Sequence, residues 1–534
     1  MKAFQNNVAE VSLISAKAYS DPFNDITLYA IFTDPEGIKR KVPAFWAGKG
    51  SWKIRYSSSV IGIHHYTTEC SDEDNCDLNG IIGFLEIVKY EGINPLFLHG
   101  AVRRRGDDLF LSHSDGVPFF YLADTWWMGF TKRLELQDGF KILTEDRVKK
   151  GFTVVQIVAG LYPDMEPFDE RGANEGGFPW DKDYHSVNPA YFDEADKKIE
   201  WLVQNGIVPC IVGSWGFYMG IVGKDVLKRH WQNLIGRWAA YPVIWCIAGE
   251  ANMAFYDAKV SYEEHLKASR RDWNDIAGFV HKNDAFHRLV TIHPTSNGHE
   301  QIEDETLLDL DMLQTGHSGP FSLLPTLKQV RAAVGRKRLP VINAEVCYEG
   351  ICGSSYADVQ RYVFLSNFML GTCGHTYGAN GIWQVNTKDK PYGVSPHGAQ
   401  WGTTPWTEAY KLPGSEQIGL SKQFLMRFKW WLFNPHPEWV EAPCSCEALD
   451  GNFAAGIPSE VRIIFQPFWG GRFWGDTLIK NIEADIKYHA FRFNPTTGEI
   501  LDLGMVKPDD NGNWRLPRSN IFQDWLSVLI NEDN

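Results

Sequence analysis

The chain has 534 residues, which is too long for one ordinary domain and predicts two to four domains, one of them large enough for a barrel. Hydrophobic residues make up 44% and charged residues 22%, as in ordinary globular proteins, which excludes a largely disordered chain. The net charge of −14, with no basic run beyond Arg103-Arg104-Arg105, excludes nucleic acid as the expected partner and favours a neutral or cationic substrate.

The first residues, Met1 to Asn7, contain no apolar core of a signal peptide, and no apolar run long enough to span a membrane follows. The sequence as written therefore predicts a cytoplasmic protein without a membrane partner. The prediction changes to a periplasmic or secreted protein if a signal peptide has been removed. The oligomeric state stays open, with a homo-oligomer among the alternatives.

Residues 1–108 show the pattern of short β-strands. Apolar residues alternate or run together over residues 8–14 and 26–32, and Asp34-Pro35-Glu36-Gly37 is a turn sequence. Several short strands at this spacing predict an N-terminal β-sandwich. Cys70 and Cys76 lie in a loop-like stretch of this part, and a disulfide between them remains open.

Residues 109–433 show a different pattern, in which short apolar runs alternate with amphipathic helical stretches. Eight strands can be counted, at residues 119–123, 153–158, 208–212, 243–248, 289–293, 312–315, 339–344 and 374–377. This pattern predicts an α/β fold with a closed (β/α)₈ (TIM) barrel. The alternative is an open doubly wound sheet, which would need a glycine-rich phosphate turn where Asp124-Thr125-Trp126-Trp127 stands.

Residues 434–534 return to a β pattern. Apolar strands are expected at 461–465, 488–493 and 525–530, and Asn494-Pro495-Thr496-Thr497-Gly498 forms a turn. The sequence therefore predicts a C-terminal β-sandwich, so that the barrel is flanked by a sandwich on each side.

Two glutamates follow buried strands of the predicted barrel. Glu250 comes after strand four and Glu345 after strand seven, and barrel enzymes place their active sites at these strand ends. A carboxyl group against an apolar strand has a raised pKa, which suits a general acid, whereas a nucleophile must stay ionised. The alternative is that each carboxylate pairs with an arginine or caps a helix.

Other polar and aromatic residues also follow the predicted strands. Their side chains could bind sugar hydroxyls or pack on sugar rings, and a content of 14% aromatic residues, with 21 tryptophans, favours a carbohydrate ligand. Each could instead be a core aromatic or a structural histidine. The candidate substrate-binding residues are Asp124, Trp126, Trp127, Trp215, Asn252, His293, His317, His375, Tyr377 and Trp383.

No metal or other cofactor is expected. The nine cysteines include no Cys-x-x-Cys pair, and no His-x-His or His-Glu-x-x-His spacing occurs. A lyase or an isomerase on the same barrel would need a lysine or a metal at the strand ends, and the sequence shows neither.

The first strand region, Gly116 to Trp127, together with Gly151 to Gln156, resembles the apiosidase-like glycoside hydrolase family. The resemblance implies a clan A type (β/α)₈ barrel between two β-sandwiches, with Glu250 as acid/base and Glu345 as nucleophile. The chain departs from the family pattern at Ala248-Gly249-Glu250, where the family has Gly-Gly-Asp. Clan A enzymes also carry an asparagine before the acid/base residue, and Asn252 is a candidate to replace it.

These observations together predict a glycoside hydrolase that cleaves a plant or microbial oligosaccharide or polysaccharide by a retaining double displacement. Two alternatives remain open: an inverting glycosidase, and a non-catalytic carbohydrate-binding protein on a barrel scaffold. The sugar and the linkage are not predicted.

Overall fold

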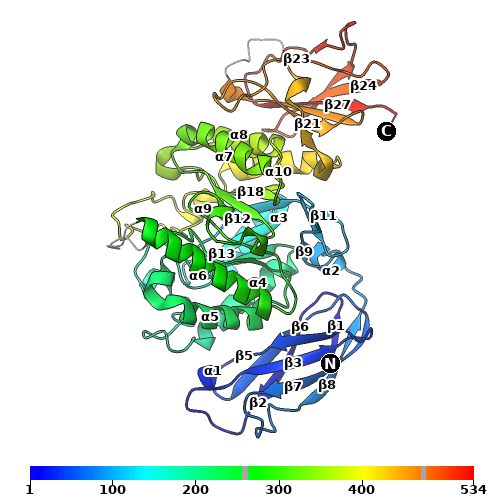
Figure 1. Ribbon diagram of the computed structural model, residues 1–534. Coiled ribbons are helices and arrows are strands. Elements are labelled where there is room, and N and C mark those ends of the chain that lie inside the picture. The colour runs from blue at the N-terminus through cyan, green and yellow to red at the C-terminus, as the bar shows by residue number, and fades with distance from the viewer. Residues whose placement is uncertain (255–261, 471–476, 534) are drawn as a thin grey trace.

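The computed structural model describes residues 1–254, 262–470 and 477–533. Figure 1 shows three parts in chain order, a β-sandwich, a barrel and a second β-sandwich, stacked with the barrel in the middle. Among the described residues, no helix is both long and apolar enough to cross a bilayer.

The N-terminal sandwich consists of two sheets whose strands alternate buried and more exposed side chains. Phe32 of one sheet stacks on Tyr56 of the other with 3.9 Å between ring centroids, which joins the two layers. The larger sheet has the order β1 (Lys2–Phe4), β8 (Ile82–Val88), β7 (Gly62–Cys70), β3 (Leu28–Thr33) and β4 (Lys39–Pro43). The smaller has the order β2 (Ala9–Ile14), β6 (Ser51–Tyr56) and β5 (Phe45–Trp46).

The structure adds detail at two points of this region. Cys70 is buried at the end of β7 and Cys76 is exposed, and both are free thiols, so the disulfide does not form. A small sheet of β9 (Val102–Arg103), β10 (Leu111–His113) and β11 (Pro118–Phe119) links sandwich and barrel. The boundary expected at residue 108 falls between two strands of this sheet.

The barrel has eight parallel strands, which confirms the (β/α)₈ prediction. Their order is β16 (Val290–Thr291), β15 (Ile244–Cys246), β14 (Val208–Val212), β13 (Val154–Val158), β12 (Tyr121–Thr125), β19 (Gly374–Tyr377), β18 (Val341–Glu345) and β17 (Asp311–Gln314). The gap between β16 and β17 is closed by hydrogen bonds from Thr291 Oγ1 to the Leu310 carbonyl, at 2.7 Å, and from the Asp309 amide to the Val290 carbonyl, at 2.8 Å.

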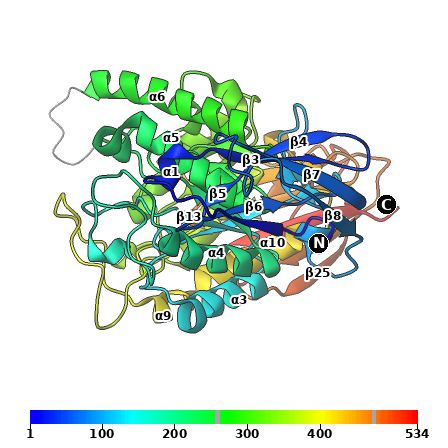
Figure 2. The same cartoon turned by 90° about the horizontal axis from the view of Figure 1, so that it is seen from below.

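Helices cover the outside of the strands, and Figure 2 shows α3 to α6 around β13. In α4, Asn188 caps the first turn and Pro189 begins it, while Ile199 and Leu202 face the strands. The barrel helices are α3 (Lys141–Lys149), α4 (Pro189–Gln204), α5 (Tyr218–Trp238), α6 (Tyr262–Asn283), α7 (Leu323–Gly335), α8 (Ala357–Met369), α9 (Trp406–Ala409) and α10 (Pro413–Leu425). Two short helices, α1 (Pro22–Asp25) and α2 (Pro95–Leu98), precede them.

The C-terminal sandwich packs a six-stranded sheet against a two-stranded one. The larger sheet has the order β20 (Asn434–Pro435), β21 (Phe453–Ile457), β22 (Val461–Gln466), β27 (Trp525–Asn531), β24 (Tyr488–Phe493) and β25 (Ile500–Met505). The smaller consists of β23 (Leu478–Ile479) and β26 (Trp514–Arg515).

Both sandwiches contact the helical layer of the barrel. Arg55 of β6 pairs with Asp196 of α4 at 2.6 Å, and Arg361 of α8 pairs with Asp524 near β27 at 2.9 Å. Both ion pairs involve helices on the outside of the barrel. Neither of them brings a sandwich to the carboxyl ends of the barrel strands.

Candidate active site

Glu345 is the last residue of β18, and three side chains surround its buried carboxylate. Tyr348 Oη donates a hydrogen bond to Oε1 at 2.6 Å, and His317 Nε2 lies 2.9 Å from the same oxygen. His293 Nε2 lies 2.9 Å from Oε2. Burial alone would raise the pKa of Glu345, but the hydrogen bonds and positive charge of the two histidines outweigh it and hold the pKa well below its usual range. Glu345 is therefore ionised at neutral pH.

Glu250 lies four residues beyond the end of β15, in a bend where its own φ is +42°, a left-handed conformation that is unusual for a glutamate. Gln314 Nε2, at the end of β17, donates to Oε1 at 2.8 Å, and Trp215 Nε1 donates to Oε2 at 3.3 Å. Burial, followed by the negative charge of Glu345, raises the pKa of Glu250 to about 7 despite the opposing hydrogen bond from Gln314. The two carboxyl groups thus differ in protonation near neutral pH.

His293 connects the two glutamates. The backbone N–H of Glu250 points at His293 Nδ1 across 3.5 Å, while His293 Nε2 faces Glu345 Oε2. The imidazole ring therefore contacts both glutamates, with one ring nitrogen facing each of them. His293 is fully buried, and its ring lies close to those of Trp127 and Trp215.

Three predicted tryptophans lie around the pair. Trp127 Nε1 donates to Tyr348 Oη at 3.0 Å, and its ring stands edge-on to Trp215 with 5.5 Å between centroids. Trp383 stacks on the Tyr348 ring with 6.1 Å between centroids. The structure therefore brings together Trp127, Trp215, Glu250, His293, His317, Glu345 and Trp383.

Four predicted residues are not brought to the glutamates, because their side chains point outward. Asp124 accepts from Trp126 Nε1 at 2.8 Å and from Arg147 Nε of α3 at 2.6 Å. Tyr377 stands in register with Asp124 on the next strand and donates to Glu349, while His375, two residues earlier, meets Phe364 of α8. Residues two apart on a strand share a face, and this face contacts the helices. The expected sugar contacts of Asp124, Trp126, His375 and Tyr377 do not fit these positions.

Asn252 also turns away from the pair. Its Oδ1 accepts a hydrogen bond from Ser269 Oγ of α6 at 2.8 Å, which directs the amide towards the helix. The expectation that Asn252 replaces the asparagine of clan A enzymes therefore does not match its direction.

Three side chains of the cluster were not predicted from the sequence. Gln314 and Tyr348 bond directly to the two carboxyl groups, and Trp401 lies 6.5 Å from His317 between ring centroids. Gln314 carried a signal, because it lies near the end of the strand predicted at residues 312–315. Tyr348 and Trp401 stand in loops whose path the strand pattern does not predict.

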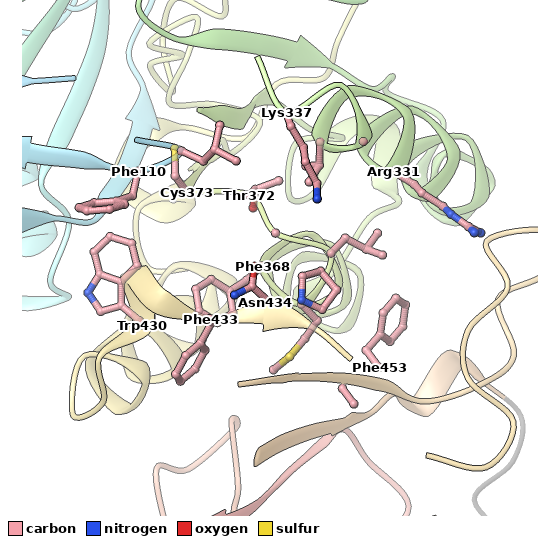
Figure 3. A pocket seen from close by; sticks show the side chains of 18 of the residues that line it. Phe110, Arg331, Lys337, Phe368, Thr372, Cys373, Trp430, Phe433, Asn434 and Phe453 are labelled. Atoms are coloured by element: carbon pink, nitrogen blue, oxygen red, sulfur yellow. The ribbon is translucent and has the colours of Figure 1, made fainter. Parts of the chain in front are cut away.

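A cleft of about 800 Å³ opens at the other end of the barrel, between α7, the start of β19 and the C-terminal sandwich. In Figure 3, Lys337 lies on one side of it, with Cys373, Trp430 and Phe453 on the others. It lies at the amino ends of the strands, so it is separate from the glutamate pair. Within the described ranges, no group of three or more histidine, cysteine or acidic side chains is arranged to hold a metal ion.

Solved structures share the fold over most of their length. A candidate glycoside hydrolase from Bacteroides vulgatus ATCC 8482 aligns over 99% of both chains with a TM-score of 0.71 and 16% identity. A glycoside hydrolase family 5 protein from the same organism covers 83% of this chain and 96% of its own, with a TM-score of 0.67 and 19% identity. Another structure described as a glycoside hydrolase gives 0.67 and 19%, over 83% of this chain and 99% of its own.

Comparison with families of protein sequences gives matches to two parts of the chain. No curated protein matches the chain significantly. A domain of unknown function named DUF5060 matches residues 3–71, in the N-terminal sandwich. The model of the apiosidase-like catalytic domain matches residues 106–432, which is more than half of the chain and includes both glutamates. The predicted resemblance is thus confirmed, and the chain belongs to the apiosidase-like family of glycoside hydrolase-like proteins.

Proposed function

We propose that this protein hydrolyses a glycosidic bond with retention of the anomeric configuration, with Glu345 as nucleophile and Glu250 as acid/base. The observation that carries the proposal is the contrast between the two carboxyl groups. Glu345 is held ionised by two histidines and a tyrosine, whereas the pKa of Glu250 is raised to about 7. A double displacement needs one carboxylate and one carboxylic acid on the two sides of the bond.

In the first step, Glu345 forms a bond to the anomeric carbon as the glycosidic C–O bond breaks. Oε2 is the better placed oxygen, since one ring nitrogen faces it while Oε1 meets both Tyr348 and His317. A carboxylate oxygen has two lone pairs, so Oε2 keeps one for the sugar. Glu250 gives its proton to the departing oxygen and becomes a carboxylate.

In the second step, the Glu250 carboxylate takes a proton from a water molecule. The water oxygen bonds to the anomeric carbon, and the bond between that carbon and Glu345 breaks. The hydrogen bond that Gln314 donates to Glu250 Oε1 supports the carboxylate formed in the first step. Both glutamates return to their starting protonation states.

The surroundings of the pair favour a neutral sugar from a plant or microbial oligosaccharide or polysaccharide. Indole rings of Trp127, Trp215 and Trp383 are apolar surfaces suited to the C–H faces of a sugar ring. The cluster adds two carboxyl groups, and the chain as a whole is acidic. An anionic uronic sugar would meet repulsion from these carboxylates.

The test is a screen of aryl glycosides and of plant and microbial oligosaccharides, with the first-formed product anomer read by ¹H NMR. Retention supports the double displacement. Inversion would replace it with a single displacement through an activated water. Saturable sugar binding without any turnover would indicate a carbohydrate-binding protein.

A further inference from the structure

Trp215 and Gly249 pack directly against each other beside Glu250. A Cβ atom on Gly249 would lie 2.4 Å from two carbons of the Trp215 six-membered ring, so only glycine leaves room for the indole. The indole is buried, and its Nε1 faces Glu250 Oε2 at 3.3 Å. The space that a side chain at position 249 would need is therefore filled by the Trp215 ring, which comes from the end of the neighbouring strand.

Backbone hydrogen bonds fix this arrangement. The Gly216 amide donates to the Gly249 carbonyl at 2.7 Å, and the Gly249 amide donates to the Ser214 carbonyl at 2.9 Å. A Cβ on Gly216 would lie 2.2 Å from the Glu250 carbonyl oxygen, so the backbone segments that follow β14 and β15 are in close contact at this point. Trp215 thus has little freedom to move away from Glu250.

The indole also lies close to other residues of the site. Trp127 stands edge-on to it at 5.5 Å and His293 lies 6.2 Å away between ring centroids. The indole therefore lies between Gly249 and the aromatic group around Glu345, next to the Glu250 carboxyl group. Excluding water from a carboxyl group disfavours its charged form.

We propose that Trp215, seated on Gly249, is the positioning residue of Glu250, and that it acts both as the wall that keeps water from the carboxyl group and as a hydrogen-bond donor that aims it. Glycine at 249 serves only to admit the indole. The proposal rests on the acid/base role of Glu250 proposed above. It also accounts for the left-handed backbone of Glu250, which the contact between the two strand ends maintains.

The test is a double-mutant cycle of Gly249→Ala and Trp215→Ala, with kcat/KM measured against pH. Each single variant should lose about 100-fold in kcat/KM, because the acid/base group is no longer held in place. The double variant should be no worse than Trp215→Ala, since the three atoms nearest to a Cβ at 249 all belong to the indole. An equal loss from Gly249→Ala in both backgrounds would overturn the proposal.

The pH profile separates positioning from simple damage to the fold. Without the wall, water reaches Glu250, its pKa falls, and the alkaline limb of kcat/KM moves to lower pH by about one unit. Trp215→Phe keeps an aromatic wall and loses the N–H, so its alkaline limb should stay at the wild-type pH or above it. An alkaline limb that is unchanged in Trp215→Ala contradicts the proposal.

Gly83→Ala is the matched control. A Cβ there would also lie 2.4 Å from an aromatic ring, that of Tyr66, but in the N-terminal sandwich. It should change the melting temperature and leave the alkaline limb in place. Titration of [δ-¹³C]glutamate-labelled protein, with Glu250→Gln to assign the signal, reads the same pKa without turnover. An inactive protein in which Trp215→Ala still lowers this pKa would refute the glycosidase and keep the positioning role.

Discussion

The ends of strands β15 and β18 present the same residue type in two different environments. At β18, Glu345 meets two histidines and a tyrosine hydroxyl, and its pKa is held well below the usual range. At β15, Glu250 meets an indole and a side-chain amide, which carry no charge, and its pKa is raised. Glu345 is buried and Glu250 is half-buried, and the charge on the neighbouring donors distinguishes their protonation states.

The two ends nevertheless share a packing arrangement. Gly249 admits the Trp215 ring, and Gly378 after β19 admits the Tyr348 ring, where a Cβ would lie 2.0 Å from a ring carbon. In each case a glycine beside one strand end lets an aromatic donor from the adjacent end reach a glutamate. One steric solution thus serves two glutamates whose pKa values are shifted in opposite directions, with only the donors changed.

The largest effect is expected for Glu345→Gln, because an amide cannot form the glycosyl intermediate. Turnover should fall by roughly 10⁴-fold or more, measured as kcat on the best substrate from the screen. The folded state should persist, with circular dichroism as the control. Activity close to wild type in this variant would contradict the nucleophile assignment.

Glu250→Gln should have a smaller effect that depends on the leaving group. Loss of the general acid should lower kcat/KM by about 10²- to 10⁴-fold on a poor leaving group. With a dinitrophenyl glycoside the bond-breaking step needs little protonation, so the loss should be much smaller. In the wild type, kcat/KM should fall above about pH 7, where Glu250 loses its proton. Equal losses on both substrate types would remove Glu250 from the acid role.

His317→Ala tests why the two glutamates differ. The variant removes a hydrogen bond and a positive charge from Glu345 Oε1, so the pKa of Glu345 should rise. The acidic limb of kcat/KM should move to higher pH, with a fall of about one order of magnitude at the optimum. His64→Ala, a buried histidine of the N-terminal sandwich that bonds to Tyr56, is the control. An unmoved acidic limb in His317→Ala would show that His293 and Tyr348 suffice.

Asp124→Asn should have the smallest effect on catalysis. Asp124 and Arg147 form a fully buried ion pair at 2.6 Å, outside the glutamate cluster. Breaking such a pair costs about 3 kcal/mol of unfolding free energy, which chemical denaturation can measure. The pH limbs of kcat/KM should not move. A selective loss of substrate affinity without destabilisation would instead place Asp124 in a sugar subsite.

The strand pattern was sufficient for the architecture, since alternating apolar runs and amphipathic helices have few other solutions. It also located Glu250 and Glu345 at the ends of strands four and seven. Position at a strand end did not tell which way a side chain points. Asp124 and Tyr377 follow the same alternation as the core and face the helices, whereas Trp127 faces the glutamates.

The sequence by itself determined the two sandwiches, the barrel and the two carboxyl groups, because these follow from local periodicity and chain order. Only the tertiary structure decided their chemistry. The histidines of Glu345, the Gln314 amide at Glu250 and the indole seated on Gly249 come from other strand ends. The pKa of a carboxyl group depends on the charges and dipoles within a few ångströms, and barrel closure determines which of them arrive there.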